Sequence, residues 1–538
     1  MVWRLLPFTV LLLQACGGDD DDGAGAGGQA ADSGPSGGAS GEVTGQADAA
    51  VVGGCDAAPV RDRDAATSVE PDGTVVVEPD AAVATPIPNE TCDDAAANGI
   101  ALVLGSAEGV QDTLTPVATA ERFFILAQDG GGDPAPGTSI VLFTDAKPAD
   151  DEFSVAHPDL VLTLYARQGG QWSQIAQNDD PEPRVSNDSA LFSRLPPSED
   201  GRYCVRIAEC TVVFGSENCA PAADITNDAF ALQAFSVPPE LQEAEPNDDA
   251  ATASPVEFMP ADEGGYFNIV AAGVSATPTD VDVWSFSVPV DAFVDLGGDA
   301  GEVAGACRFG FFSPGADGNG SSATAGVNAA VADAADPLTP LARTDVFADP
   351  ANPAEVSFRC QAGGSYVLSI SRAPDAAAGA NDFYFWRHAL TETNPIEAEG
   401  RAGGAPDGNN IGAMAEALTP VQNDDGSVSY FVEGAIDHAD DLDYFSVEVP
   451  AGMTKFGAGC EGQRIGSAVR NLTLRTFTNP DLSASVDEAT ATESALEAAG
   501  FLDVDVAGNT GLILAVTAQS LDPGIRGAGY RCGFHLSP

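Results

Sequence analysis

The sequence predicts an all-β protein built as three tandem antiparallel β-sandwich domains of jelly-roll-like form. Short segments with alternating apolar and polar residues, bounded by Gly, Pro, Asn and Asp, recur along most of the chain and are typical of strands. Landmarks repeat with a period of about 150 residues, and helical periodicity is nearly absent. The 538 residues are enough for such an array, at about 100–200 residues per domain.

The first sixteen residues, MVWRLLPFTVLLLQAC, have the features of an export signal. One basic residue, Arg4, precedes an apolar run at 5–13 that is too short to span a bilayer. The end of this segment resembles the lipobox of bacterial lipoproteins, which implies lipidation of Cys16 and anchoring to a membrane. Ordinary secretory cleavage near Ala15 is the alternative. In the lipoprotein resemblance, Gly17 argues against retention in the inner membrane, so we expect an exported outer-membrane or cell-surface protein.

A long segment at 17–86 is rich in Gly, Ala, Asp, Ser and Pro and lacks aromatic residues. It cannot bury enough apolar surface to offset the entropy of ordering, which predicts a disordered acidic tether. The predicted divisions are a signal peptide at 1–16, the tether at 17–86, and three sandwiches at 87–238, 239–392 and 393–538.

The charge balance is strongly acidic, with 81 Asp and Glu against 22 Lys and Arg and a net charge of −59. Contacts to phosphate groups depend on Lys and Arg, so nucleic-acid binding is excluded. Mutual repulsion among the acids instead favours association with cations.

The cysteines indicate disulfides, because the chain is predicted to reach an oxidising compartment. In the second and third repeats one pair each is the sole candidate, Cys307–Cys360 and Cys460–Cys532. In the first repeat the pairing is open, although the short loop favours Cys210–Cys219. The remaining cysteines are Cys92 and Cys204, with Cys55 in the tether. None has Cys-x-x-Cys spacing, which argues against zinc.

Two strand segments show the repeat most clearly, TDVDVWSFSV at Thr279–Val288 and DDLDYFSVEV at Asp440–Val449. Side chains two apart share one face of a strand. Each strand therefore begins with carboxylates at the edge of a sandwich and continues with core residues. The matched acids are Asp280 with Asp441 and Asp282 with Asp443.

Two other segments carry specific expectations. The aromatic strand Asp382–Leu390 has apolar residues on both faces, and we interpret it as packed in a core rather than as a binding surface. The segment Ala489–Gly500 is predicted to form one or two helical turns.

The stretch EAEPNDDAATA at Glu243–Ala253, followed about thirty residues later by Asp-x-Asp-Val-Trp-Ser-Phe, resembles the bacterial pre-peptidase C-terminal domain. The first repeat resembles it through Asn178-Asp179-Asp180 and GRYCVR at 201–206. The resemblance covers 87–538 as three copies and implies jelly-roll-like sandwiches found on secreted peptidases and surface proteins.

The same resemblance implies calcium where the linker meets the sandwich. Calcium prefers six to eight oxygen ligands, and without a cation this density of carboxylates would be repulsive. The alternative is that these acids are solvated turns on a generally acidic surface. In the second repeat the implied ligands are Glu243, Glu245, Asn247, Asp248, Asp280 and Asp282.

Calcium is expected most strongly in the second repeat, less so in the third and not in the first. The third repeat keeps Glu397, Glu399, Asp441 and Asp443, but GRAGGAPDGNN replaces Pro-Asn-Asp. The first repeat has Ala120 and Arg122 at the positions of the strand aspartates. One hypothesis is that Arg122 takes the place of the ion by pairing with Glu90 or Asp93.

No catalytic constellation is evident in the sequence. The histidines are widely spread and none lies in an H-E-x-x-H motif, while a G-x-S-x-G match at 34–38 falls in the tether. The favoured function is a non-catalytic, lipid-anchored surface protein of calcium-stabilised modules, acting in adhesion or in binding an extracellular matrix or polymer. The alternatives are an accessory or regulatory partner of a secreted peptidase, and a hydrolase with an unrecognised site.

Overall fold

The computed structural model describes residues 89–538 with internal gaps. The gaps are 107–108, 118, 146–157, 179–188, 216–218, 220–227, 259–268, 276, 278, 293–303, 313–325, 345–354, 374–382, 392–396, 398–408, 424–425, 437, 439–440, 479–488 and 494–497. The predicted signal peptide with Cys16, the predicted tether with Cys55, and Glu399 lie outside the described residues. None of the described helices is long and apolar enough to cross a membrane.

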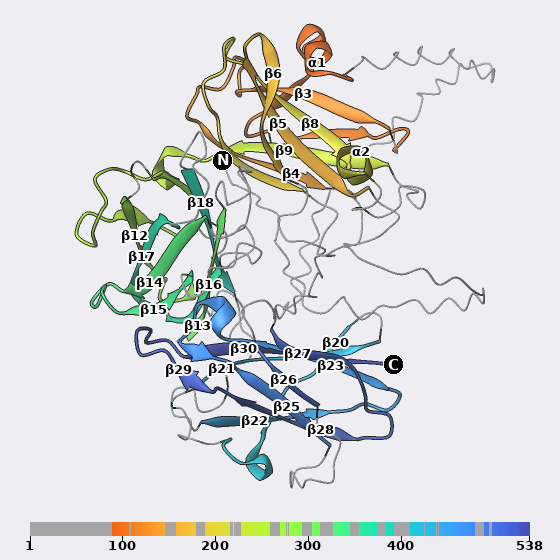
Figure 1. The fold of residues 1–538 in the computed structure, drawn as a ribbon, viewed down its shortest axis with the longest axis vertical. Helices are drawn as coiled ribbons and strands as arrows, with labels where there is room; N and C mark the ends of the chain where they lie inside the picture. Colours follow the sequence, from red (N-terminus) through yellow and green to blue (C-terminus); the bar gives the residue numbers. More distant parts are fainter. Residues whose placement is uncertain are drawn as a thin grey trace, which may run out of the picture. The chain divides into compact units, whose positions relative to one another are not determined.

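The described residues form two compact units, one ending at Ser236 and the other running from Val237 to Pro538. The first unit contains one pair of sheets, here called sandwich 1, and the second contains two pairs, sandwich 2 and sandwich 3 (Figure 1). The predicted all-β sandwich fold is thereby confirmed, while the predicted domain limits stay predictions.

Sandwich 1 consists of a sheet with strand order β1-β3-β8-β5-β6 and a sheet with order β2-β9-β4-β7. Apolar side chains from both sheets form one buried core. The strands are β1 Ala101–Val103, β2 Val110–Thr113, β3 Glu121–Ala127, β4 Ser139–Asp145, β5 Leu160–Gln168, β6 Gln171–Asn178, β7 Ala190–Arg194, β8 Tyr203–Glu209 and β9 Ala229–Ser236, with helices α1 Cys92–Asn98 and α2 Cys210–Phe214.

Sandwich 2 consists of a sheet β10-β12-β17-β14-β15 and a sheet β11-β18-β13-β16. Its core is rich in aromatic residues from both sheets, such as Trp284 and Trp386, whose rings are 5.3 Å apart. The elements are β10 Ser254–Val256, β11 Ile269–Val274, β12 Val281–Ser287, β13 Ala304–Phe312, β14 Val327–Asp333, β15 Pro340–Arg343, β16 Glu355–Gln361, β17 Ser365–Arg372 and β18 Phe383–Thr391, with a 3-10 turn η2 at Pro239–Leu241.

Sandwich 3 consists of a sheet β19-β22-β28-β25-β26 and a sheet β20-β21-β30-β23-β27, drawn in blue as two stacked layers in Figure 1. The strands are β19 Glu416–Ala417, β20 Val421–Gln422, β21 Val428–Ala435, β22 Leu442–Glu448, β23 Lys455–Glu461, β24 Val469–Arg470, β25 Thr473–Phe477, β26 Ala489–Thr492, β27 Ala499–Asp505, β28 Gly511–Thr517, β29 Ser520–Leu521 and β30 Gly529–Ser537, with 3-10 turns η4 Gly412–Met414 and η5 Gln463–Ile465. β24 and β29 pair separately.

The three sandwiches have the same strand connectivity. In each, a very short first strand pairs in parallel with a later strand of the same sheet, as β1 with β3, β10 with β12 and β19 with β22, and sandwich 3 has the additional edge strand β20. The other pairings of the two main sheets are antiparallel. The shared connectivity makes residues at matching strand positions directly comparable between sandwiches.

Two local expectations need correction. The segment predicted as helical turns contains β26, whose Thr492 pairs with Thr473 of β25, because Ala and Thr alternate there with the period of a strand. The sequence analysis also did not predict α1. That helix begins after Thr91, whose hydroxyl accepts the Asp94 amide hydrogen at 3.0 Å, and ends at Gly99 in the left-handed conformation.

Four disulfides lie within the described residues. They include the three expected pairs and a further bridge that joins α1 to β8. The bridges are Cys92–Cys204, Cys210–Cys219, Cys307–Cys360 and Cys460–Cys532.

The strand β18 is buried on both faces, as expected from its sequence. On one face Phe385 is fully buried, and on the other Trp386 and His388 are each 1 % exposed. Among the described residues, neither ring nitrogen of His388 has a hydrogen-bond partner. Rings of Phe258 and Phe309 lie 4.6 and 4.4 Å from the His388 ring. This aromatic strand is therefore core, and its histidine is enclosed by apolar rings.

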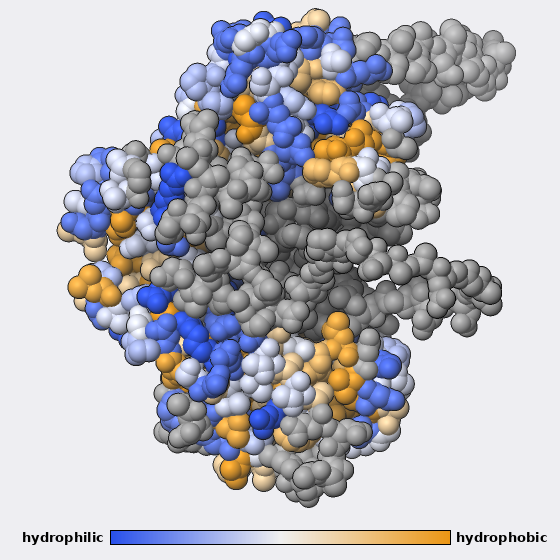
Figure 2. Space-filling view, viewed as in Figure 1, coloured by the Kyte–Doolittle hydropathy of each residue, from blue (hydrophilic) through white to orange (hydrophobic). Residues whose placement is uncertain are grey.

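Large apolar side chains on the surface are scattered. In Figure 2 the coloured part of the visible face is mainly hydrophilic, with separate hydrophobic spots. Leu338 and Val290 are the most exposed of the large apolar residues, at 91 % and 81 %. Single exposed residues of this kind are normal in soluble domains.

Candidate metal centre

The linker that enters sandwich 2 is fixed to both sheets by backbone hydrogen bonds. The Glu243 amide donates to the Ala272 carbonyl in β11 at 3.1 Å. Four residues later, the Asn247 carbonyl accepts the Val283 amide hydrogen of β12 at 2.9 Å. The acidic residues between these two points are therefore held against the edge where the sheets meet.

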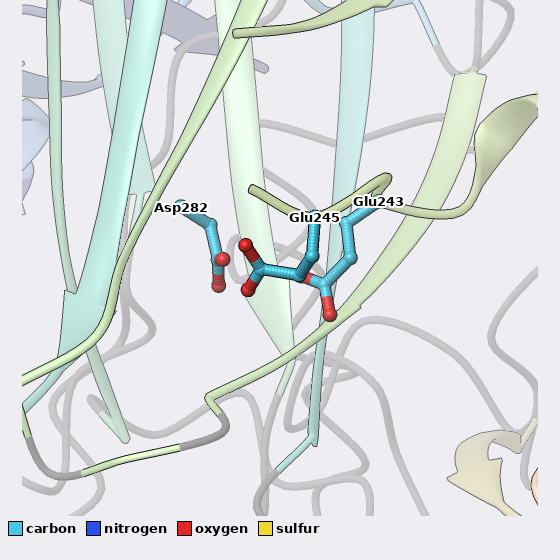
Figure 3. A group of neighbouring side chains, drawn as sticks. All are labelled: Glu243, Glu245 and Asp282. Atoms are coloured by element: carbon cyan, nitrogen blue, oxygen red, sulfur yellow. The ribbon is translucent and has the colours of Figure 1, made fainter. Parts of the chain in front are cut away.

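Three carboxylates converge at this edge. Glu243, Glu245 and Asp282 each offer an oxygen, and these oxygens all lie within 4.8 Å of one another. Figure 3 shows the three side chains pointing toward a common region. Glu245 accepts the Asn247 amide hydrogen at 3.1 Å, which fixes the turn that presents it.

A buried tyrosine closes the inner side of the group. The Tyr384 hydroxyl donates to Glu243 Oε2 at 3.3 Å and accepts from Trp284 Nε1 at 3.0 Å. Glu243 Oε1 accepts the Val274 amide hydrogen at 2.8 Å. The carboxylate of Glu243 is thus oriented from β11 and from β18, which leaves its charge directed toward the other two acids.

The group carries excess negative charge. Burial, with the charge of Asp282 next in size, raises the pKa of Glu243 to about 8. Burial, together with the charge of Asp280, raises the pKa of Asp282 to about 6, against the lowering effect of the Tyr384 hydrogen bond. A site that binds protons this strongly is also one where a cation would be stabilised.

The other predicted ligands of the second repeat have different surroundings. The Asn247 side chain is fully buried and its amide nitrogen donates to Ser254 Oγ at 3.4 Å. Asp280 lies near enough to Asp282 to affect its pKa. Asp248 is exposed and is not among the grouped carboxylates. Of the six predicted ligands, Glu243, Glu245 and Asp282 are brought together, with Asp280 beside them.

Sandwich 3 repeats this arrangement with different residues. The Glu397 amide donates to the Glu433 carbonyl at 3.0 Å, and Glu397 Oε1 accepts the Ala435 amide hydrogen at 2.5 Å. The Tyr530 hydroxyl donates to Asp443 at 2.6 Å and lies 3.4 Å from Glu397. Glu397 and Asp443 therefore occupy in sandwich 3 the positions that Glu243 and Asp282 occupy in sandwich 2.

One residue that completes the match in sandwich 3, Asn409, was not among the predicted ligands. The Asn409 carbonyl accepts the Tyr444 amide hydrogen of β22 at 3.1 Å, as Asn247 does in sandwich 2. The asparagines at the end of GRAGGAPDGNN are the signal that could have revealed it. Asp441 is fully buried, and the neighbouring Asn410 side chain accepts the Leu442 amide hydrogen at 3.0 Å.

Sandwich 1 has the same backbone frame but a different charge pattern. The Asn89 carbonyl accepts the Phe123 amide hydrogen of β3 at 3.0 Å, which places Arg122 where the others have Asp. Arg122 Nε lies 3.4 Å from a carboxylate oxygen of Asp112 in β2. At this position, sandwich 1 has an ion pair in place of a group of carboxylates.

Strand register confirms which positions correspond. The last strand of each sandwich has an aromatic residue second, and that residue pairs with the penultimate residue of a neighbouring strand. The register pairs are Asp112 with Phe230, Gly273 with Tyr384, and Gly434 with Tyr530. The strands β3, β12 and β22 also correspond to one another, and their second residues are Arg122, Asp282 and Asp443.

The partner expected for Arg122 was wrong. Arg122 pairs with Asp112, whereas Asp93 accepts hydrogen bonds at 3.0 Å from Arg167 and Trp172 on β5 and β6. Glu90 is exposed. The sequence could not show this, because Asp112 reaches Arg122 only through the pairing of strands in the two sheets.

Two glycines are required by the tyrosines of the carboxylate groups. A Cβ atom on Gly273 would lie 2.2 Å from the Tyr384 ring, and one on Gly434 would lie 2.3 Å from the Tyr530 ring. Each ring crosses the backbone of the neighbouring strand to reach its carboxylates. Neither glycine nor tyrosine was identified from the sequence, although the Gly and Tyr occur at matching strand positions.

Replacing Arg122 with Met is expected to lower the free energy of unfolding of sandwich 1 by about 1 kcal/mol or less, because the ion pair is partly exposed. The loss should be the same in calcium and in EDTA, as measured by urea unfolding. The exposed Arg202→Met in the same sandwich is the control, with an effect within about 0.5 kcal/mol. A loss that calcium restores would mean that the ion pair is not what neutralises this site.

No family model matches the chain, and no curated protein matches it. Among solved structures, the CUB1-EGF-CUB2 domains of rat MASP-1 are 8 % identical, with 52 % of this chain and 99 % of that chain covered and a TM-score of 0.17. Tandem CBM51 modules of a family 98 glycoside hydrolase from Streptococcus pneumoniae are 9 % identical, with 52 % and 88 % covered and a TM-score of 0.15. The ANXUR1 extracellular domain from Arabidopsis thaliana is 8 % identical, with 53 % and 95 % covered and a TM-score of 0.16. Values this low carry no argument about function.

Proposed function

We propose that this chain is a non-catalytic surface protein whose second sandwich, and to a lesser degree its third, is stabilised by calcium. In this proposal Cys16 carries a lipid anchor, and the sandwiches present a binding surface for adhesion or for an extracellular polymer. The resemblance to pre-peptidase C-terminal domains in EAEPNDDAATA supports the ion. Four disulfides are typical of an exported protein and support the location.

The donor set in sandwich 2 fits a hard cation. Glu243, Glu245 and Asp282 offer only carboxylate oxygens, which is the chemistry that calcium prefers. Oxygens bound to one calcium at about 2.3–2.6 Å are at most about 5 Å apart, and the three oxygens here lie within 4.8 Å of one another. These residues would hold the ion, with Asp280 close by, and the ion would join the linker to both sheets.

The observation that carries the proposal is the comparison among the three sandwiches. The same backbone frame places Asp282, Asp443 or Arg122 at one position. Where the residue is Arg122, its positive charge is matched by Asp112 and the acids of the other sandwiches are absent. An arginine thus occupies in sandwich 1 the position at which sandwich 2 has Asp282 of the group of three carboxylates.

Calcium is expected to raise the thermal midpoint of sandwich 2 by several degrees. At ten millimolar calcium and a dissociation constant of about 10⁻⁴ M, binding adds about 2.7 kcal/mol. The measurement is the unfolding of the full chain, followed by tryptophan fluorescence in calcium, in magnesium and in EDTA. A calcium-specific rise is the expected result.

The matched variants are Asp282→Asn, which removes one grouped carboxylate, and Glu257→Gln, which removes an exposed acid elsewhere in sandwich 2. The calcium response should be lost in the first and kept in the second. Equal midpoints of the wild type in calcium and EDTA would show that the acids do not bind calcium, and the proposed stabilisation would then be abandoned.

A further inference from the structure

Sandwiches 2 and 3 are joined by backbone hydrogen bonds along an exposed sheet edge. The edge strand β15 donates from the Arg343 amide to the Gly466 carbonyl at 2.9 Å. In the other direction, the Arg526 and Gly527 amides donate to the carbonyls of Pro340 and Leu341 at 2.8 and 3.1 Å. Edge strands expose unpaired backbone groups that invite such pairing, and here the pairing partner is the next sandwich.

Two glycines of sandwich 3 allow this approach. A Cβ atom on Gly527 would lie 2.2 Å from the Leu341 carbonyl oxygen, and one on Gly466 would lie 2.8 Å from the Arg343 carbonyl oxygen. Gly466 also has a φ of +81°, which side-chain-bearing residues rarely adopt. A glycine is needed at position 527 because of the contact with sandwich 2, and not because of the fold of sandwich 3 itself.

Ion pairs cross the same interface in both directions. Arg531 of sandwich 3 binds Glu355 of sandwich 2 at 3.0 Å and Glu461 of its own sandwich at 2.9 Å. Arg308 of sandwich 2 binds Glu433 of sandwich 3 at 3.2 Å. Arg308 and Arg531 are both buried, which is rare for charged side chains and requires that they be paired.

A second group of ion pairs lies beside β15. Arg343 of sandwich 2 is 3.6 Å from Asp522 of sandwich 3. Arg526 of sandwich 3 pairs with Asp333 and with Asp336 of sandwich 2. In a chain with only 22 basic residues against 81 acidic ones, four arginines contribute to this one interface, two from each side.

The interface is also adjacent to the core of sandwich 3. On β30, Tyr530 points inward to Asp443, while the next residue, Arg531, points outward to Glu355. On β21, the Glu433 carboxylate binds Arg308 and its carbonyl accepts the Glu397 amide hydrogen. The strands β21 and β30 therefore contribute both to the carboxylate group of sandwich 3 and to the interface with sandwich 2.

We propose that sandwiches 2 and 3 form a single cooperative unit, so that neither unfolds without destabilising the other. The two are held together by the backbone pairing of β15 and by the ion pairs of the four interface arginines. This goes beyond the calcium proposal and does not depend on it. Joined in this way, sandwiches 2 and 3 would present their binding surfaces at a fixed relative orientation, whereas flexibly linked modules would not.

Tryptophan provides a readout restricted to sandwich 2. The chain has four tryptophans, Trp3, Trp172, Trp284 and Trp386, and the last two are in the core of sandwich 2. In a full chain carrying Trp3→Phe and Trp172→Phe, fluorescence therefore reports the unfolding of sandwich 2 alone. Leu474, fully buried on β25 of sandwich 3, lies in the sheet that does not face the interface.

The experiment is thermal unfolding of this reporter chain with and without Leu474→Ala. A cooperative body predicts that this cavity in sandwich 3 lowers the midpoint reported from sandwich 2 by about 5 °C or more. An unchanged fluorescence midpoint, with circular dichroism showing that sandwich 3 melts earlier, would overturn the proposal.

Uncoupling variants test the interface itself. In the reporter chain, Gly527→Ala should abolish the effect of Leu474→Ala on the fluorescence midpoint, because the new Cβ separates β15 from its partner. Gly529→Ala is the matched control, since its Cβ would meet only an ordinary contact at 3.6 Å. Arg308→Met with Arg343→Met weakens the interface from the sandwich 2 side, and the effect of Leu474→Ala should shrink there too. Full transmission in both uncoupling variants would show that this interface does not couple the two sandwiches.

Discussion

Replacing His388 with Phe is expected to raise the free energy of unfolding by about 3 kcal/mol relative to the wild type at pH 4. At pH 7 the two proteins should differ by less than about 1.5 kcal/mol, because the exchange nearly conserves volume within an apolar site. The reason is the burial of the imidazole among Phe258, Phe286 and Phe309, where neither ring nitrogen has a hydrogen-bond partner among the residues that the structure describes.

The sign follows from where the proton binds. Burial lowers the pKa of His388 to about 3, while in the unfolded chain it is 6.5. Below pH 6.5 the unfolded state binds a proton that the folded state does not, so stability falls by about 1.4 kcal/mol for each pH unit. The stability that the neutral, buried His388 contributes is fully present above its pKa in the unfolded chain. It is lost progressively as the pH falls toward the pKa of His388 in the folded protein.

The measurement is urea unfolding of both proteins at pH 7 and pH 4, followed by tryptophan fluorescence. Phe311→Leu, which changes another buried ring of sandwich 2 but no titrating group, is the control and should lower the stability by the same amount at both pH values. Parallel stability curves for the wild type and His388→Phe would mean that the folded protein accommodates the charged imidazole.

The strands were predictable where they are long and half-buried. β12 and β22 are each seven residues long, and the aspartate and aromatic residues on one face of each strand mark the edge and the core. β10 and β19 have three and two residues, which is too short for an alternation to be recognised. Their parallel pairing is set by tertiary contacts and leaves no local pattern in the sequence.

The carboxylates of the candidate metal centre were predictable from the sequence, but the residues that hold them in place were not. Glu243, Glu245 and Asp282 stand out because carboxylates cluster there without basic neighbours. Tyr384 lies 141 residues after Glu243, and it reaches Glu243 only because β18 pairs with β11 across Gly273. Such register information is absent from a single sequence.

The same limit explains the error at Arg122. Glu90 and Asp93 were the expected partners because they lie in the segment of the first repeat that matches EAEPNDD, and no motif marks Asp112 as a partner although it is closer to Arg122 in the sequence. In the fold Asp112 occupies the strand position of Gly273, and it lies 3.4 Å from Arg122, which occupies the position of Asp282. Comparison of the three sandwiches by strand position, rather than by sequence motif, is what identifies the pair.

In EDTA, the unit that contains sandwich 2 is expected to lose stability as the pH rises from 5 to 8. Burial and the charge of Asp282 raise the pKa of Glu243 to about 8, against 4.5 in the unfolded chain. The stability associated with a raised pKa is fully present below the unfolded value and is lost as the pH rises through the folded value. Glu243 alone contributes a slope of at most about 1.4 kcal/mol for each pH unit, and the raised pKa of Asp282 adds a further contribution at the acidic end.

Glu243→Gln isolates this effect, because it removes the titrating carboxylate and keeps an oxygen for the Tyr384 hydroxyl. Relative to the wild type, the variant should become more stable in EDTA as the pH rises, as measured by urea unfolding at pH 5, 6.5 and 8. Calcium binds the deprotonated carboxylates, so ten millimolar calcium should flatten the wild-type slope and have little effect on the variant. Equal slopes of the two proteins in EDTA would mean that the carboxylates are ionised without cost in the folded state. A slope that is present in EDTA but unaffected by calcium would instead mean that protons, and not calcium, neutralise this group.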